Sequence, residues 1–311
     1  MQRQHSTKTP ISCRQILKKH DSVNAWLFAL PALLGLFCFV LFPFLLAVML
    51  SFTNLRLGSP LPTEFVGLTQ YQRILADTAF LQALKNNTLF ALIVVPLQTG
   101  LALMLALLIN QPLRGMTIFR TLFFMPVVFP LSLVAVVWVL LFAPGPQGTL
   151  NSTLEFITLG GWQPRDFLHD PHWALPAITL TSIWQGVGFQ MVILLAALQA
   201  IPTELYEAAK VDGANQRQQL LYITLPQLRN ALIFVVLVTT ILAFRLFDQV
   251  QIMTQGGPLY ATTTVMYEAV NTAFASQQDA KGAAMTVVFF SIVLLLTLLQ
   301  RAIVKHEKVI E

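Results

Sequence analysis

One polar segment, residues 201–226, stands between two long apolar runs and holds the residue pattern with the clearest functional meaning. It reads Glu207-Ala208-Ala209, three residues, Gly213, nine residues, and then Ile223-Thr224-Leu225-Pro226. Both signs of charge are mixed along it and just beyond its end: Glu204, Glu207, Lys210, Asp212, Arg217 and Arg229. This mixture suits a soluble protein partner better than an anionic lipid surface. The chemistry that we expect here is therefore docking.

The local sequence predicts two short helices that meet at a glycine corner. Pro202 and Thr203 suit a helix start, with Glu204 and Glu207 in the first turn, where acidic side chains favour the positive end of the helix dipole. An apolar side with small residues follows: Leu205, Ala208, Ala209 and Val211. Gly213 suits the left-handed conformation that ends a helix. A second helix is expected over about 214–222, before Pro226 opens the next apolar run. The alternative is an amphipathic connector that lies on lipid headgroups.

Polar side chains inside the apolar runs form a second candidate site. The run 173–200 holds Trp184, Gln185 and Gln190, and Gln98 lies in the run 87–110. An indole face and amide groups suit a sugar, which presents C–H faces and hydroxyls. The alternative is that these amides bond neighbouring helices while Gly186 and Gly188 allow close packing. Arg245 and Asp248, three residues apart, are expected on one helical face, where they either pair and anchor a helix end or line a cavity.

Other kinds of chemistry lack the residues they need. The apolar runs hold no paired carboxylates, histidine cluster or nucleophile beside a base, so we expect neither a catalytic residue nor a metal site. A glycine-rich phosphate loop with Lys and Ser or Thr is also absent. Cys13 and Cys38 support neither a disulfide framework nor a metal site. His169 and His172 are expected to be exposed to solvent.

Composition places the protein in a membrane. Of its 311 residues, 56% are hydrophobic and 11% are charged, whereas soluble domains carry about 25% charged residues. Charges are costly at the centre of a membrane helix, so long charge-free stretches mark the spans. We predict an all-α protein with six transmembrane helices over about 25–52, 87–110, 117–142, 173–200, 226–247 and 284–304. Prolines inside these spans are expected to kink them.

The basic residues predict the orientation. With the N-terminus inside, the inner segments hold thirteen Lys and Arg and the outer segments five. This bias agrees with the positive-inside rule, so both termini are expected in the cytoplasm. We therefore expect tails over 1–24 and 305–311, and a single transmembrane domain over 25–304 whose cytoplasmic loop is 201–225. The formal charge of +5 needs no nucleic-acid partner, because the basic residues flank the membrane.

The chain resembles a known family at the segment described first. Its Glu-Ala-Ala, Gly and Ile-x-Leu-Pro positions match the signature loop of permease subunits in binding-protein-dependent ABC importers. Further elements are similar to the subgroup that moves sugars and glycerol phosphates: Phe65-Val66-Gly67-Leu68 with Tyr71, Ala83-Leu84-Lys85-Asn86-Asn87-Thr88, Phe247-Asp248 and Thr254-Gln255-Gly256-Gly257-Pro258.

The resemblance implies the type I ABC importer permease fold and a transport function by alternating access in the bacterial inner membrane. It implies that the loop seats in a cleft of a cytoplasmic ATPase through Leu205, Glu207, Ala208, Ala209, Lys210, Asp212 and Gly213. It further implies an extracytoplasmic solute-binding protein, two copies of the ATPase, and a second permease subunit that is expected to be a different chain. ATP and Mg²⁺ would then belong to the ATPase, with no cofactor in this chain.

Three other functions remain as alternatives. One is the same architecture with an amino acid, phosphate or metal as its solute. Another is a secondary transporter or channel, which would favour ionisable residues within the spans and inverted repeats. An intramembrane enzyme is the third, and it conflicts with the lack of catalytic groups.

Overall fold

The computed structural model describes residues 26–60, 62–111 and 115–305. The predicted tail 1–24 and nearly all of the tail 305–311 lie outside these residues. Within them the chain is helical, apart from loops and one isolated bridge between Thr53 and Phe65. Five helical segments are long and apolar enough to cross a membrane: Trp26–Leu50, Thr78–Ile109, Ala174–Gln199, Gln216–Met253 and Asp279–Ala302. The all-α prediction is confirmed.

The predicted third span is wrong as a single helix. Residues 117–142 form α5 (Met116–Val128) and α6 (Leu131–Leu141), which are bent by 99° relative to one another. Pro130 is the N-cap of α6, and Phe129 before it is extended. A proline lacks the N–H of a helical residue and disfavours helix in the residue before it, so the helix stops here. Pro96, by contrast, lies inside the unbroken helix α4.

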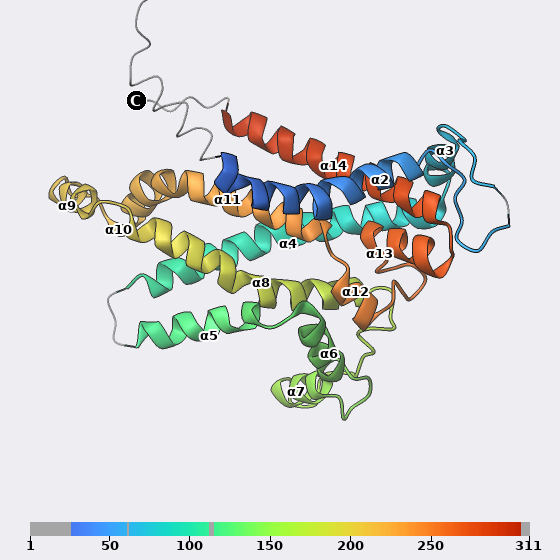
Figure 1. The fold of residues 1–311 in the computed structure, drawn as a ribbon. Helices are drawn as coiled ribbons and strands as arrows, with labels where there is room; N and C mark the ends of the chain where they lie inside the picture. The colour runs from blue at the N-terminus through green and yellow to red at the C-terminus, as the bar shows by residue number, and fades with distance from the viewer. Residues whose placement is uncertain (1–25, 61, 112–114, 306–311) are drawn as a thin grey trace, which may run out of the picture.

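The remaining helices follow in chain order and are shown in Figure 1. The first span contains η1 (Phe37–Leu41) and α2 (Phe42–Leu50), and α3 (Thr69–Leu75) precedes α4 (Thr78–Ile109). Then come α7 (Thr149–Ile157), α8 (Ala174–Gln199), α9 (Thr203–Val211), α10 (Gln216–Gln219), η2 (Leu220–Thr224), α11 (Leu225–Phe244) and α12 (Asp248–Met253). The last are α13 (Val265–Val270), η3 (Asn271–Ala275) and α14 (Asp279–Lys305).

Helix α8 is the centre of the bundle. It packs along α4 and also contacts α5 and α11. In the most apolar stretch of α8, 61% of the residues are buried, against 0% in the first span. Figure 1 shows α9 and α10 at one end of the bundle and α3 and α13 at the other. We call these the α9 end and the α13 end.

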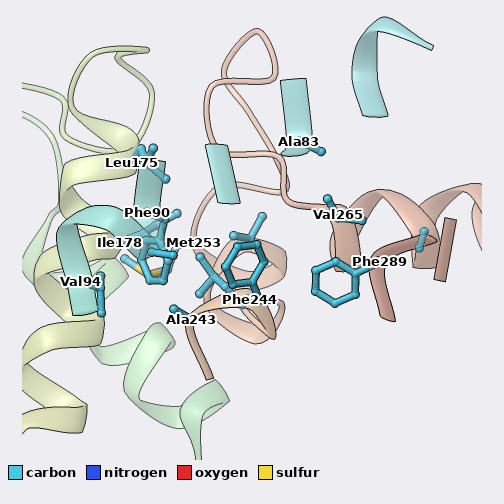
Figure 2. Close-up of a cluster of buried hydrophobic side chains, with 14 of the residues drawn as sticks. Ala83, Phe90, Val94, Leu175, Ile178, Ala243, Phe244, Met253, Val265 and Phe289 are labelled. Carbon is cyan, nitrogen blue, oxygen red and sulfur yellow. The ribbon is translucent and has the colours of Figure 1, made fainter. Parts of the chain in front are cut away.

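Two clusters of buried apolar side chains hold the helices together. The cluster toward the α13 end joins α4, α8, α11 and α12, and Figure 2 shows Phe90, Ile178 and Met253 lying together in it. The cluster toward the α9 end includes Ala106 of α4 and Met191 of α8. Small residues such as Ala106 bring helices close, which suits packing where burial from water is not the driving force.

Candidate functional site

A cavity of about 340 Å³ lies beside the apolar cluster toward the α13 end, which supplies Phe90, Val94, Ala243 and Leu246 to its wall. Helices α4, α8 and α11 and the segment leading into α12 form most of its wall, and α5 and α6 contribute one residue each. Its lining combines apolar and polar side chains: Phe90, Val94, Gln98, Val127, Leu131, Ser182, Gln185, Gly186, Phe189, Gln190, Thr239, Leu242, Ala243, Arg245, Leu246, Phe247, Asp248 and Gln249. An apolar pocket with a few converging polar groups is typical of a ligand site.

The structure brings together five of the six residues that the sequence singles out for a solute pathway. They are Gln98, Gln185, Gln190, Arg245 and Asp248. Trp184 is not among the residues that line the cavity. Its indole instead packs edge-on against Trp138, with 5.6 Å between the ring centroids. On the helix, Trp184 is adjacent to Gln185 and therefore points to a different side.

Hydrogen bonds between helices hold the amides of the cavity wall in place. The Gln190 Nε2 donates to Thr239 Oγ1 at 2.5 Å, which joins α8 to α11. Ser182 Oγ donates to Gln249 Oε1, and Gln249 Nε2 donates to Gln185 Oε1 at 3.4 Å. Bonding between helices and lining a cavity, which the sequence analysis treats as alternatives, thus occur in the same residues.

Two glycines of α8 allow neighbouring elements to approach the helix. A Cβ at Gly186 would lie 1.9 Å from the side-chain nitrogen of Gln98, and a Cβ at Gly188 would lie 1.9 Å from the carbonyl oxygen of Phe123. Even alanine therefore overlaps a neighbour at both positions. Gly186 leaves room for the Gln98 amide at the cavity wall, and Gly188 sets the close contact between α5 and α8.

Arg245 and Asp248 do not share a helical face. Helix α11 ends at Phe244, Arg245 is its C-cap, and Asp248 begins α12 after a break. Among the described residues no ion pair joins the two side chains. Both line the cavity, so the helix break brings one positive and one negative group to its wall. Phe247 and Gln249 flank Asp248 and also line the cavity. Sequence reasoning missed them as site residues, although Phe247-Asp248 formed part of the family resemblance.

Two asparagines attach α4 to the segment before α13. The buried Asn86 Nδ2 donates to the carbonyl oxygens of Tyr260 and Thr263 at 2.8 and 2.9 Å. Asn87, which is fully buried, accepts from the Val265 N–H at 2.8 Å, and its Nδ2 donates to the carbonyl oxygen of Phe244 at 3.4 Å. Sequence reasoning noted these amides only as part of the resemblance and missed this role.

Charged groups at the α13 end also connect helices. Lys281 of α14 forms a 2.6 Å ion pair with Asp77, whose carboxylate caps α4. Burial opposes ionisation of Asp77, but the hydrogen bond and charge of Lys281, together with the backbone N–H groups of Ala79 and Phe80, outweigh it and hold the pKa of Asp77 below its usual value. At Glu268, burial raises the pKa and the charge of Asp77 raises it further. His169 and His172 of the α7–α8 loop are exposed, as predicted.

The segment at the α9 end has the predicted glycine corner but only one separate short helix. Helix α9 begins after Pro202 and ends at Val211, and Gly213 follows with a φ of +79°. The predicted second helix is instead the start of the next span, because α10, η2 and α11 continue one another from Gln216 to Phe244. Asn215 caps this long helix in a reciprocal pair with Gln218. Pro226 is compatible with the continuous helix because it sits in the first turn of α11, directly after the wider π turn η2.

Helix α9 carries the predicted docking residues on an open surface. It has no buried residue, and Glu204 is in its first turn whereas Glu207 is one position beyond it, contrary to the prediction. Lys210 lies in the last turn, where a positive charge suits the helix dipole. The exposed members are Leu205, Glu207, Ala208, Lys210, Asp212 and Gly213, and Ala209 is half-buried. No atom of the described residues lies within 4 Å of the place where a side chain at Gly213 would begin.

Known transport proteins are similar to this chain along most of its length. The chain is 35% identical over 289 residues to the lactose transport system permease protein LacF of Rhizobium radiobacter, which covers 92% of this chain and 94% of that protein. It is 32% identical over 283 residues to the trehalose/maltose transport system permease protein MalF of Thermococcus litoralis, covering 91% and 94%. The chain is thus similar to sugar permeases over nearly its whole length.

The fold has a counterpart among solved structures. A chain in the crystal structure of a bacterial ABC transporter involved in the import of the acidic polysaccharide alginate matches with a TM-score of 0.81 and 20% sequence identity, over 95% of this chain and 100% of that chain. A family model described as the binding-protein-dependent transport system inner membrane component matches residues 98–309. The chain is a permease subunit of an ABC importer, works with a solute-binding protein, and leaves ATP hydrolysis to a separate subunit. It belongs to the family of binding-protein-dependent transport system inner membrane components.

Proposed function

We propose that this permease subunit moves a sugar or polyol phosphate through its central cavity by alternating access. The observation that carries the proposal is the cavity wall, which combines four glutamines, Arg245 and Asp248 with the phenyl rings of Phe90, Phe189 and Phe247. Amides and charged groups bond hydroxyls, and aromatic rings pack against the C–H faces of a sugar ring. The volume of about 340 Å³ falls in the range of small-molecule sites, about 300–1,000 Å³.

The kind of solute is supported by relatives as well as by the wall. The names of two relatives give lactose and trehalose/maltose as their solutes. One feature of the wall favours a charged solute instead: Arg245 and Asp248 offer one group of each sign. A phosphorylated polyol would use Arg245, whereas a neutral sugar would use both groups as hydrogen-bond partners.

We further propose that α9 is the docking site for a cytoplasmic ATPase. The support is that α9 has no buried residue, that Glu207, Lys210 and Asp212 mix both signs of charge, and that the small side chains of Ala208 and Ala209 lie between them. The working assembly then contains two ATPases that hold ATP and Mg²⁺, a solute-binding protein, and a second permease subunit of different sequence. It lies in the bacterial inner membrane with both termini in the cytoplasm.

Purification of the assembly tests the composition and the solute. The chain is solubilised in mild detergent and captured by a tag, and the co-purifying proteins are identified by mass spectrometry. The binding protein recovered is then screened by thermal shift against lactose, maltose, trehalose, glycerol 3-phosphate and a panel of amino acids. We expect an ATPase, a second permease and a shift with a sugar or polyol phosphate. A shift with amino acids alone would contradict the sugar proposal.

Variants at the glycine corner test the coupling role. Gly213→Pro is incompatible with a φ of +79°, because proline holds φ near −65°, so α9 would be displaced. Gly213→Asn is the matched control, because asparagine tolerates the left-handed region better than most residues. With expression and membrane insertion matched, we expect uptake to be abolished in the proline variant and largely retained in the asparagine variant. Normal uptake by Gly213→Pro would refute the coupling role.

A further inference from the structure

One hydrogen bond joins the exposed helix α9 to the span that follows it. The hydroxyl of Tyr206 lies 3.0 Å from Oγ1 of Thr224. In the described part of the chain, it is the only hydrogen bond from a side chain of α9 to another helix. Tyr206 is half-buried and packs against the apolar cluster toward the α9 end, whereas its neighbours Leu205 and Glu207 are exposed.

The direction of this bond follows from the other contact of Thr224. Its single hydroxyl proton is donated to the carbonyl oxygen of Gln219 at 3.3 Å. Tyr206 is therefore the donor, and Thr224 Oγ1 accepts from it. Thr224 is 5% exposed, so the acceptor is shielded from water and the bond has little competition from solvent.

Thr224 stands at an unusual point of the long helix. It ends η2 (Leu220–Thr224), a turn of π-helix between α10 and α11, and the next backbone N–H bonds five residues back to Leu220. Single π turns inside α-helices are rare and occur frequently at functional sites. The side chain of Thr224 reaches the same wide turn by bonding the residue five positions before it. The contact from α9 therefore meets span five where its helix is irregular.

Residues 212–215, which link α9 to this span, do not hold α9 rigidly. Gly213 has open space around it and takes a left-handed conformation, and α9 itself contains no buried residue. A force on α9 would rotate the helix about Gly213 unless a second contact fixed α9 to span five. The cluster packing and the hydroxyl of Tyr206 supply that contact.

We propose that Tyr206 is a positioning residue that transmits movement of α9 to α11 through its hydrogen bond to Thr224 at the π turn. The inference rests on the proposed coupling role of α9 and goes beyond it by naming the contact. Coupling between two sites needs an element whose position both of them bias, and the Tyr206–Thr224 bond makes α9 and span five such a unit. Two variants remove the bond with little change of shape, Tyr206→Phe and Thr224→Val, and Thr224→Ser keeps it.

The test measures how ATP changes access to the cavity in the full complex. Leu242 lines the cavity and is 51% exposed, so Leu242→Cys in a background with Cys13→Ser and Cys38→Ser serves as the reporter. Its rate of maleimide labelling is measured in proteoliposomes with and without ATP. We expect Tyr206→Phe and Thr224→Val each to reduce the ATP-dependent change about fivefold, as for one hydrogen bond. Thr224→Ser should stay within about twofold of the parent, and the double variant should resemble either single variant.

Two results would overturn the inference. One is an unchanged ATP response in Tyr206→Phe or Thr224→Val when the complexes contain the same subunits and melt at the same temperature. The other is a double variant whose loss is the product of the two single losses. A parent complex with no ATP response at all would instead refute alternating access itself, and the inference would fall with it.

Discussion

At the scale of residues, single asparagine amides connect the helices at the α13 end of the bundle. Asn87 is 0% exposed, and its one side chain bonds α4 to the end of α11 and to the start of α13. These partners are backbone groups at helix ends, where carbonyls and N–H groups lack a partner within the helix. One asparagine thus satisfies groups from two other elements, and its loss leaves them buried without partners.

We predict that Asn87→Ala lowers the stability of the chain by about 2 kcal/mol, because a buried donor or acceptor without a partner costs about 1–3 kcal/mol. Thermal unfolding of the protein in detergent measures the change. Thr88→Ala is the matched control, since among the described residues the exposed Thr88 hydroxyl bonds only to Leu84 of its own helix. Equal melting temperatures for Asn87→Ala and Thr88→Ala would show that the hydrogen bonds of the Asn87 side chain do not stabilise the fold.

Glu268 makes the stability of the α13 end depend on pH. Burial and the charge of Asp77 raise the pKa of its carboxyl, so the folded pKa lies above the unfolded value of about 4.3. Glu268 therefore favours the fold below about pH 4, and this contribution is lost as pH rises through the folded pKa. We predict that the melting temperature of Glu268→Gln, relative to the parent, rises between about pH 4 and pH 7. A falling difference for Glu268→Gln would contradict the assignment.

At the scale of helices, contact distance between α5 and α8 is set by Gly188. The backbone of Phe123 occupies the place where a side chain at Gly188 would begin, and backbone atoms cannot move aside as a flexible side chain can. We predict that Gly188→Ala separates the two helices, lowers the melting temperature and reduces uptake. Gly100→Ala is the control, because Gly100 lies inside α4 with nothing within 4 Å and alanine favours a helix by about 1 kcal/mol. Equal behaviour of the two variants would exclude this role for Gly188.

The spans are predictable from the sequence, whereas the bends within them are not. Lengths of charge-free sequence predict the spans well, because the cost of a charge in the membrane is the same wherever the span lies in the fold. The effect of a proline is not predictable in this way: Pro96 is tolerated within α4, whereas Pro130 lies at a 99° bend. The outcome depends on neighbours that are distant in sequence. Helix α6 packs against α12, a contact that a straight third span would not make.

The residues of the cavity wall are likewise predictable in part from the sequence. Polar side chains within apolar runs or at their ends identify five residues of the cavity wall, because a polar group in the membrane is costly unless it faces a partner or a cavity. Residue type alone does not give the direction of a side chain on its helix: Gln185 lines the cavity, whereas its neighbour Trp184 packs against Trp138. The continuous helix from Gln216 to Phe244 was also missed, because the π turn η2 leaves no mark in the residue types.

At the scale of the whole molecule, the cavity and α9 lie on the same pair of spans. Helix α8 supplies five residues of the cavity wall and leads through residues 200–202 into α9, and α11 supplies three more and follows α9 through the glycine corner. We propose that a displacement of α9 reaches both walls of the cavity, through residues 200–202 on the side of α8 and through the Tyr206–Thr224 contact on the side of α11. This arrangement links the proposed docking helix at one end of the bundle to the proposed solute cavity in its middle.

The location of α9 is the claim on which this account depends, and site-specific labelling tests it directly. Val211, at the end of α9, is 88% exposed, so Val211→Cys in the background with Cys13→Ser and Cys38→Ser provides one accessible thiol. We predict that a membrane-impermeant maleimide labels it in inside-out vesicles, that it stays unlabelled in intact cells, and that the bound ATPase protects it. Labelling in intact cells, or an unchanged labelling rate when the ATPase is stripped from the vesicles, would contradict the account.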